Sequence, residues 1–205
     1  QKTAYEIASC LVGSEMCIRD RVFLDLGCEL TFDARVNGKT VENYLDTRKH
    51  GDLMISLRPP PTNWERAWKA NNQAHPLVRQ WKFLGLGVAV ADLDATVAYY
   101  ATMGFEAVSD PMTDTVLGTR RQGVQVGPLA FEFSEALSDT SVVADSLSKR
   151  GDGVNDLGFG VTDLDAETQR LEAKGVTTLR RSNDNQVTYL DTRAEGNIML
   201  RLAQS

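Results

Sequence analysis

The residue types that most often carry catalysis are scarce in this chain and form no known motif. Three cysteines (Cys10, Cys17 and Cys28) and two histidines (His50 and His75) show neither the C-x-x-C nor the H-E-x-x-H spacing of metal ligands. The sequence also lacks a nucleophile elbow, a glycine-rich phosphate loop and a dinucleotide fingerprint. Any metal site would therefore depend on carboxylates.

An internal repeat predicts the elements that position the remaining candidates. VADLDATVAYYATMGFEAV, residues 90–108, matches VTDLDAETQRLEAKGVTTL, residues 161–179, at the offset of 71 residues that separates Asp92 from Asp163. In each copy an aspartate is suited to cap the start of a helix, and a glycine is suited to the left-handed turn that ends it. The pattern of each copy therefore predicts a strand, a helix of about three turns and further strands.

The strands that flank these helices place large aliphatic side chains on one face and mostly small ones on the other. The small-residue faces include Gly85 and also carry the charged side chains of Glu132, Asp156 and Arg201. A sheet face of small residues favours a concave surface of ligand size. A solvent-exposed sheet face fits the same pattern.

Two β-α-β-β-β units in tandem, with a V-x-D-L-D helix entry and a closing G-N-I-x-L strand, resemble the vicinal oxygen chelate (VOC; glyoxalase/bleomycin resistance/dioxygenase) superfamily. The segment GPLAFEFSEALSDTSVVADSLSKRGDGVNDLGFGV is most similar to its methylmalonyl-CoA epimerase-like and glyoxalase-like branch. The resemblance implies an α+β fold in which paired βαβββ modules form a curved mixed sheet around a cavity. The expected VOC domain is residues 83–205, with modules 83–150 and 151–205.

In members of that family, residues from four strands hold a divalent metal, which stabilises the anion formed when a substrate loses a proton. The resemblance places these metal positions on Gly85, Glu132, Asp156 and Arg201. Histidines are expected where Gly85 and Asp156 stand, and a glutamate is expected in place of Arg201. Glycine offers no ligating side chain and a guanidinium repels cations, so Glu132 and Asp156 would hold a divalent metal only weakly.

Alternatively, Arg201 replaces the charge of the metal and pairs with Asp156 and Glu132 through its planar donors. Glu132 and Asp156 are then the candidate catalytic residues, and Arg201 and Gly85 are the candidate substrate-binding residues. The resemblance implies an isomerase or lyase acting on a small 2-oxo or acyl-CoA substrate. A metal-free domain that sequesters a small molecule and an inactive copy within a multi-domain enzyme remain alternatives.

A third, partial copy of the repeat precedes the two modules. YLDTRKHGDLMISL, residues 44–57, nearly repeats YLDTRAEGNIMLRL, residues 189–202, and Ser56 takes the place of Arg201. We therefore expect residues 22–60 to be the C-terminal remnant of an upstream VOC domain.

Residues 1–21, QKTAYEIASCLVGSEMCIRDR, show neither strand alternation nor a helical stripe. DNA that encodes LVGSEMCIRD resembles a transposase-library sequencing adapter, so we expect a non-native adapter translation instead of a genuine N-terminal extension. Cys10 and Cys17 would then have no biological role. Proline-rich residues 61–82 are predicted to be a linker with a short helix.

The composition and net charge limit the kinds of molecule that the protein is expected to bind. A formal net charge of -6 argues against nucleic acid and anionic membrane surfaces, which require a basic footprint. The sequence has no run of about 20 apolar residues, which a membrane-spanning helix needs. We expect a cytoplasmic protein with a small-molecule partner, and a homodimer is one assembly left open. The RRQG run, residues 120–123, fits either a contact to an acidic group such as a CoA phosphate or a solvated turn.

Overall fold

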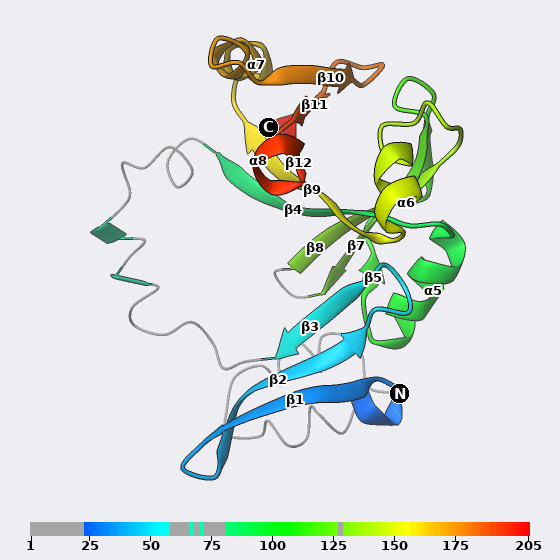
Figure 1. The fold of residues 1–205 in the computed structure, drawn as a ribbon, viewed down its shortest axis with the longest axis vertical. Helices are drawn as coiled ribbons and strands as arrows, with labels where there is room; N and C mark the ends of the chain where they lie inside the picture. The colour runs from blue at the N-terminus through cyan, green and yellow to red at the C-terminus, as the bar shows by residue number, and fades with distance from the viewer. Residues whose placement is uncertain (1–22, 58–65, 68–69, 72–80, 127–128) are drawn as a thin grey trace.

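The computed structural model describes residues 23–57, 66–67, 70–71, 81–126 and 129–205. The expected adapter translation, residues 1–21, lies outside the described residues, and so does most of the predicted linker, residues 61–82. The described part confirms the predicted α+β class, because helices pack on a curved mixed sheet (Figure 1).

The main sheet joins the two predicted modules. Its strands are β4 (Lys82–Ala89), β5 (Glu106–Ala107), β6 (Met112–Asp114), β7 (Thr119–Val126), β8 (Leu129–Ala136), β9 (Gly153–Val161), β10 (Thr177–Arg181), β11 (Val187–Asp191) and β12 (Met199–Gln204). They follow the order β10-β11-β12-β9-β4-β8-β7-β5, and β6 pairs with β7. In each module the first strand pairs in parallel with the last, β4 with β8 and β9 with β12. The antiparallel pair β4–β9 then connects the modules.

Two helices, α5 (Leu93–Thr102) and α7 (Leu164–Glu172), begin where the sequence predicts. The helices α6 (Ala144–Arg150) and α8 (Arg193–Gly196) were not predicted. The carboxylate of Asp92 accepts a hydrogen bond from the Ala95 N–H at 2.9 Å, and Asp163 accepts one from the Ala166 N–H at 2.9 Å. These bonds satisfy donors that a helix start leaves without a partner. No helix in the described ranges is long and apolar enough to cross a membrane.

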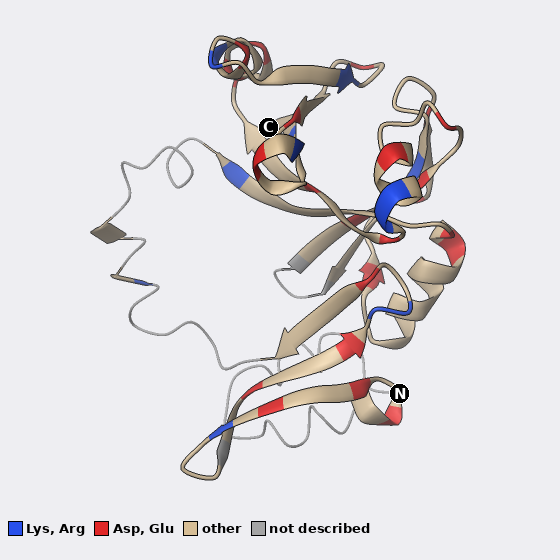
Figure 2. Cartoon of the chain, viewed as in Figure 1, with Lys and Arg blue, Asp and Glu red and all other residues tan. Residues whose placement is uncertain are grey.

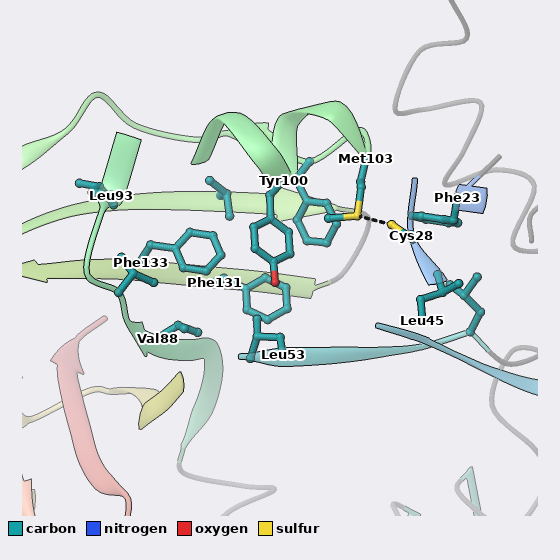
Figure 3. Packing of buried hydrophobic residues seen from close by; sticks show 14 residues of the cluster. Phe23, Cys28, Leu45, Leu53, Val88, Leu93, Tyr100, Met103, Phe131 and Phe133 are labelled. Atoms are coloured by element: carbon teal, nitrogen blue, oxygen red, sulfur yellow. Dashed lines mark hydrogen bonds between the residues drawn. The ribbon is translucent and has the colours of Figure 1, made fainter. Parts of the chain in front are cut away.

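The large side chains of the first module form a core between its sheet and α5 (Figure 3). Tyr100 of α5 lies at its centre, with its ring centroid 5.0 Å from that of Phe133 and 6.4 Å from that of Phe131. Val88 and Leu93 are fully buried beside them. Because side chains alternate along a strand, this packing turns the small residues of β4 and β8 to the opposite face.

A second sheet, of order β1-β2-β3, is built from β1 (Glu29–Val36), β2 (Lys39–Thr47) and β3 (Leu53–Leu57). It packs against α5 and shares the core of the first module. Leu45 is fully buried in that core, and the Cys28 sulfur lies 3.3 Å from the Met103 sulfur. The Tyr100 hydroxyl donates a hydrogen bond to the His50 carbonyl oxygen at 3.1 Å. Residues 23–57 thus contact the first module closely, and the descent of residues 22–60 from an upstream domain stays a prediction.

Candidate functional site

Three of the four predicted site residues come together on the inner face of the main sheet, the face turned away from α5 and α7. Gly87 of β4 pairs with Glu132 of β8 on one side and with Asp156 of β9 on the other. On the next strand, Arg201 of β12 pairs with Gly158 of β9. Paired residues point to the same face, so their side chains meet across four strands.

Arg201 binds both carboxylates. Its Nε donates to Asp156 Oδ1 at 2.7 Å, and its Nη1 lies 3.3 Å from Glu132 Oε1. The side chains of Asp156 and Arg201 are 3% and 8% exposed, whereas that of Glu132 is 22% exposed. The pairing expected of Arg201 is therefore present, and Glu132 is its most accessible member.

A fourth charged residue, Arg121, completes what we call the inner-face cluster: Arg121, Glu132, Asp156 and Arg201. Arg121 Nη1 lies 3.4 Å from Glu132 Oε1, and the side chain is 11% exposed. Its Nε is buried without a hydrogen-bond partner among the described residues. An arginine buried this far with one long contact is unusual, because buried donors almost always find an acceptor.

From the sequence, the RRQG run fitted either a contact to an acidic group or a solvated turn. The turn is wrong, because the run lies within β7, where Arg121 pairs with Ser134, and the contact to an acidic group stays a prediction. Its neighbour Arg120 points the other way and binds Asp94 of α5 at 2.6 Å. Figure 2 shows that basic and acidic residues are scattered over many elements. The alternation of strand side chains was the available signal, since Arg121 shares a face with Gly123, the partner of Glu132.

The inner-face cluster carries two carboxylates and two guanidinium groups, so its formal charge is zero. Without Arg121, the other three residues would carry a formal charge of -1. Burial raises the pKa of Asp156, and the charge of Arg201 opposes that rise. Burial alone would lower the pKa of Arg201, but Asp156 and Glu132 outweigh burial and raise it. Arg201 therefore stays charged.

The glycines predicted to leave this face bare are covered by the cluster itself. A Cβ on Gly87 would collide with the Asp156 carboxylate, and one on Gly158 would lie 2.8 Å from Arg201 Nη2. Gly85 has φ of +144°, and a Cβ there would meet the carbonyl oxygen of Ala130. Gly85 thus lies beside the cluster and contributes no side chain, and its substrate-binding role stays a prediction.

An apolar cluster fills the inner face next to these charges. It contains Leu117, Val142 and Val143 from the loops, together with Tyr189 of β11 and Met199 of β12. Burial raises the pKa of Tyr189 well above its usual range. The bare, ligand-sized surface expected from the sequence is therefore partly filled by the chain's own side chains.

A cleft of about 720 Å³ lies elsewhere, between α6, α8 and the start of β10. It shares no residue with the inner-face cluster. Of its three basic residues, Lys149 and Arg193 are both bound to Asp145, and Arg193 also binds Asp191 at 2.7 Å. The third, Arg150, donates a hydrogen bond to the Ser146 hydroxyl at 3.1 Å. Because each basic side chain already has a partner within the cleft, the cleft gives no clear preference for a ligand.

The residues at the four metal positions do not fit a divalent cation. Gly85 provides no donor atom, and the guanidinium of Arg201 lies between the two carboxylates that would have to bind the ion. Within the described ranges, no three histidine, cysteine, aspartate or glutamate side chains lie close enough together to hold a metal. Glu132 and Asp156 act as partners of arginines in this arrangement.

Comparisons with known proteins agree with this fold. The structure is similar to methylmalonyl-CoA epimerase from Mycobacterium tuberculosis, with 29% identity, a TM-score of 0.51, and 60% of this chain and 88% of that chain covered. A variant of the Streptomyces coelicolor epimerase in complex with 2-nitronate-propionyl-CoA matches with 29% identity, a TM-score of 0.54, and coverage of 62% and 98%. A methylmalonyl-CoA epimerase in complex with methylmalonyl-CoA and NH4+ matches with 29% identity and a TM-score of 0.54, and the match covers 62% of this chain and 95% of that chain.

No curated protein matches the sequence significantly. A family model described as glyoxalase/bleomycin resistance protein/dioxygenase superfamily matches residues 86–189, which extend from β4 of the first module to β11 of the second. This match and the strand order confirm the resemblance found in the sequence. The chain therefore belongs to the glyoxalase/bleomycin resistance protein/dioxygenase (VOC) superfamily.

Proposed function

We propose that this chain is a metal-independent VOC domain that binds a small oxygenated molecule, with Arg201 in place of the metal charge and Arg121 as the ligand contact. One observation carries the proposal: Arg121 is nearly buried on the inner face, yet Glu132 at 3.4 Å is its one ion-pair partner in the described part of the chain. A bound carboxylate or carbonyl oxygen would supply the acceptor that this guanidinium lacks.

Arg201 gives the domain a fixed positive charge without a metal. It is held by Asp156 at 2.7 Å and by Glu132 at 3.3 Å, and both contacts are largely shielded from water. A guanidinium in this position is always charged and cannot exchange with solvent as a weakly held ion would. We therefore expect ligand binding that does not depend on added divalent cations.

Methylmalonyl-CoA is the first ligand to test. An epimerase that is 29% identical to this chain has been solved in complex with it. The molecule carries both a free carboxylate and a thioester carbonyl, and either oxygen group suits the planar donors of Arg121. The ligand class we propose is thus an acyl-CoA or a small 2-oxo acid with an anionic end.

Catalysis is the second candidate, as an isomerase or lyase that removes a proton next to a carbonyl. The accessibility of Glu132 favours it, because this carboxylate is 22% exposed between two guanidinium groups. A base beside fixed positive charges could take the proton while the charges stabilise the enolate. Both arginines, however, are already ion-paired with the Glu132 carboxylate, so the binding role is the better supported one.

The test is calorimetric titration of methylmalonyl-CoA into the protein, with and without EDTA. We expect equal affinity in both conditions and a loss of roughly tenfold or more in Arg121→Gln, the size expected when a hydrogen bond to a charged group is removed. Lys149→Gln, in the remote cleft, is the matched control and should bind as the wild type does. Loss of binding in EDTA, or unchanged binding in Arg121→Gln, would overturn the proposal.

A deuterium-exchange assay separates binding from catalysis. If the domain only binds, methylmalonyl-CoA should take up no solvent deuterium at its α-carbon beyond the uncatalysed rate. Uptake that disappears in Glu132→Gln would instead establish the second candidate, with Glu132 as the base.

A further inference from the structure

The N-terminal strands repeat the strand register of the last module. In β2–β3, Tyr44 pairs with Ser56, and in β11–β12, Tyr189 pairs with Arg201. Tyr189 lies 145 residues after Tyr44, and Arg201 lies 145 residues after Ser56. The two YLDTR segments have the same offset. Register is set independently in each sheet by its own side chains and turns, so equal registers indicate equivalent strands.

The agreement extends to an irregularity in the outer strand pair. In β1–β2 the register shifts between Leu30 and Phe32, the partners of Leu45 and Tyr44. In β10–β11 the shift falls at the same place, between the partners of Leu190 and Tyr189. A β-bulge is a specific local feature, and its recurrence at one position makes chance similarity a poor explanation. The three strands thus correspond to the last three strands of a VOC module.

One strand pairing is missing from this third unit. In both complete modules the last strand pairs in parallel with a first strand, β8 with β4 and β12 with β9. β3 is the equivalent of β12, yet no strand in the described ranges pairs with its other edge. An open edge presents unpaired N–H and C=O groups that favour the addition of a strand.

The helix side of the unit, in contrast, is already covered. Leu45 and Leu53 are buried in the core that α5 shares with the first module, together with Tyr100 and Met103 (Figure 3). The opposite side remains open, where Phe32 and Met54 are 56% and 46% exposed. The unit therefore has a helix against one face, but no strand in the described ranges extends its sheet beyond β3.

We propose that the open edge of β3, Leu53–Leu57, accepts a parallel strand in the register that β9 adopts on β12. The occupant is the first strand of an upstream VOC module, and this rests on the expectation that residues 22–60 belong to such a module. Its pattern alternates large aliphatic residues with small ones, as in β4 and β9. Its residue opposite Met54 corresponds to Asp156, which pairs with Met199.

The test uses a synthetic peptide with the sequence of residues 153–163, GVNDLGFGVTD, as a surrogate for the missing strand. Added to the whole chain, it should slow amide exchange in β3. The variant Ser56→Arg places an arginine where β12 has Arg201. The Asp156 side chain of the bound peptide could then form the ion pair that Asp156 of β9 forms with Arg201. We expect Ser56→Arg to bind the peptide about fivefold more tightly than the wild type, the size of a favourable exposed ion pair.

A peptide with Asp156→Asn is the control, and with it the gain from Ser56→Arg should vanish. Equal affinities of both peptides for Ser56→Arg, or no protection of β3 by either peptide, would overturn the proposal. The outcome is distinguishable from that of the proposed function, since β3 contains no residue of the inner-face cluster and methylmalonyl-CoA binding does not depend on this edge.

Discussion

The guanidinium of Arg201 on β12 and the carboxylate of Asp156 on β9 form a buried ion pair, with 2.7 Å between Arg201 Nε and Asp156 Oδ1. Gly158 lies under the arginine and Gly87 lies under the aspartate, so the sheet provides room for both side chains. A divalent metal is expected at this place in relatives. We propose that in this chain the guanidinium of Arg201 supplies the positive charge there.

Replacing Arg201 should be costly. Arg201→Met would leave Asp156 charged, buried and without its partner, and breaking one side of a buried pair costs about 3–5 kcal/mol of unfolding free energy. Urea unfolding measures this loss. Lys149→Met removes an exposed ion pair and should cost under about 1 kcal/mol. Similar losses in the two variants would show that the inner-face pair is not buried as described.

A methyl group at Gly87 should have a comparable effect for a steric reason. The Cβ of Gly87→Ala would occupy the position of the Asp156 carboxylate, so either the strand or the ion pair must move. We expect a loss of about 2 kcal/mol or more in urea unfolding, the range of overpacking in a dense interior. Gly196→Ala is the matched control, because a Cβ at that position meets nothing within 4 Å. A neutral Gly87→Ala would contradict the close contact.

Much of the fold was predictable from the sequence because its signals are local. Two D-L-D helix starts, alternating strands and closing glycines establish the module, and the family resemblance supplies its pairing. Arg121 was not predictable in the same way, since its role depends on the register that brings β7 beside β8. The filling of the inner face by Val142 and Val143 was also missed, because it depends on how a loop folds back over the sheet.

The ion pair also has a pH signature. Burial raises the pKa of Asp156 in the folded state above its value in the unfolded chain, so the folded protein binds this proton more readily. Below the folded-state pKa, and down to the unfolded value of about 3.9, falling pH should therefore favour the folded wild type relative to Asp156→Asn. Urea unfolding of both proteins across this window gives the difference. If the stability difference instead shifts in favour of the wild type as pH rises, the pKa of Asp156 is lower in the folded state than in the unfolded chain.

The N-terminal sheet should unfold together with the first module. Leu45→Ala would open a cavity in the core shared with α5, at a cost of about 2–5 kcal/mol. Probes in α5 and in β2 should then report one common transition at a lower urea concentration. Separate transitions, with α5 unchanged, would show that the sheet is an independent appendage.

Hydrogen exchange should distinguish the two equivalent strands. β12 lies between β11 and β9, whereas β3 pairs only with β2 in the part of the chain that the structure describes. We expect the amides of β3 to exchange faster than those of β12, because one edge of β3 lacks a strand partner. Equal protection of the two strands would indicate that the edge of β3 is already occupied.

Metal content would show whether a divalent ion still binds beside Arg201. The purified protein would be incubated separately with Mg²⁺, Mn²⁺, Co²⁺ and Zn²⁺, dialysed, and measured by inductively coupled plasma mass spectrometry. We expect no stoichiometric divalent ion, because the carboxylates of Glu132 and Asp156 are bound to Arg201. About one tightly held ion per chain, lost in Asp156→Asn or Glu132→Gln, would contradict this expectation.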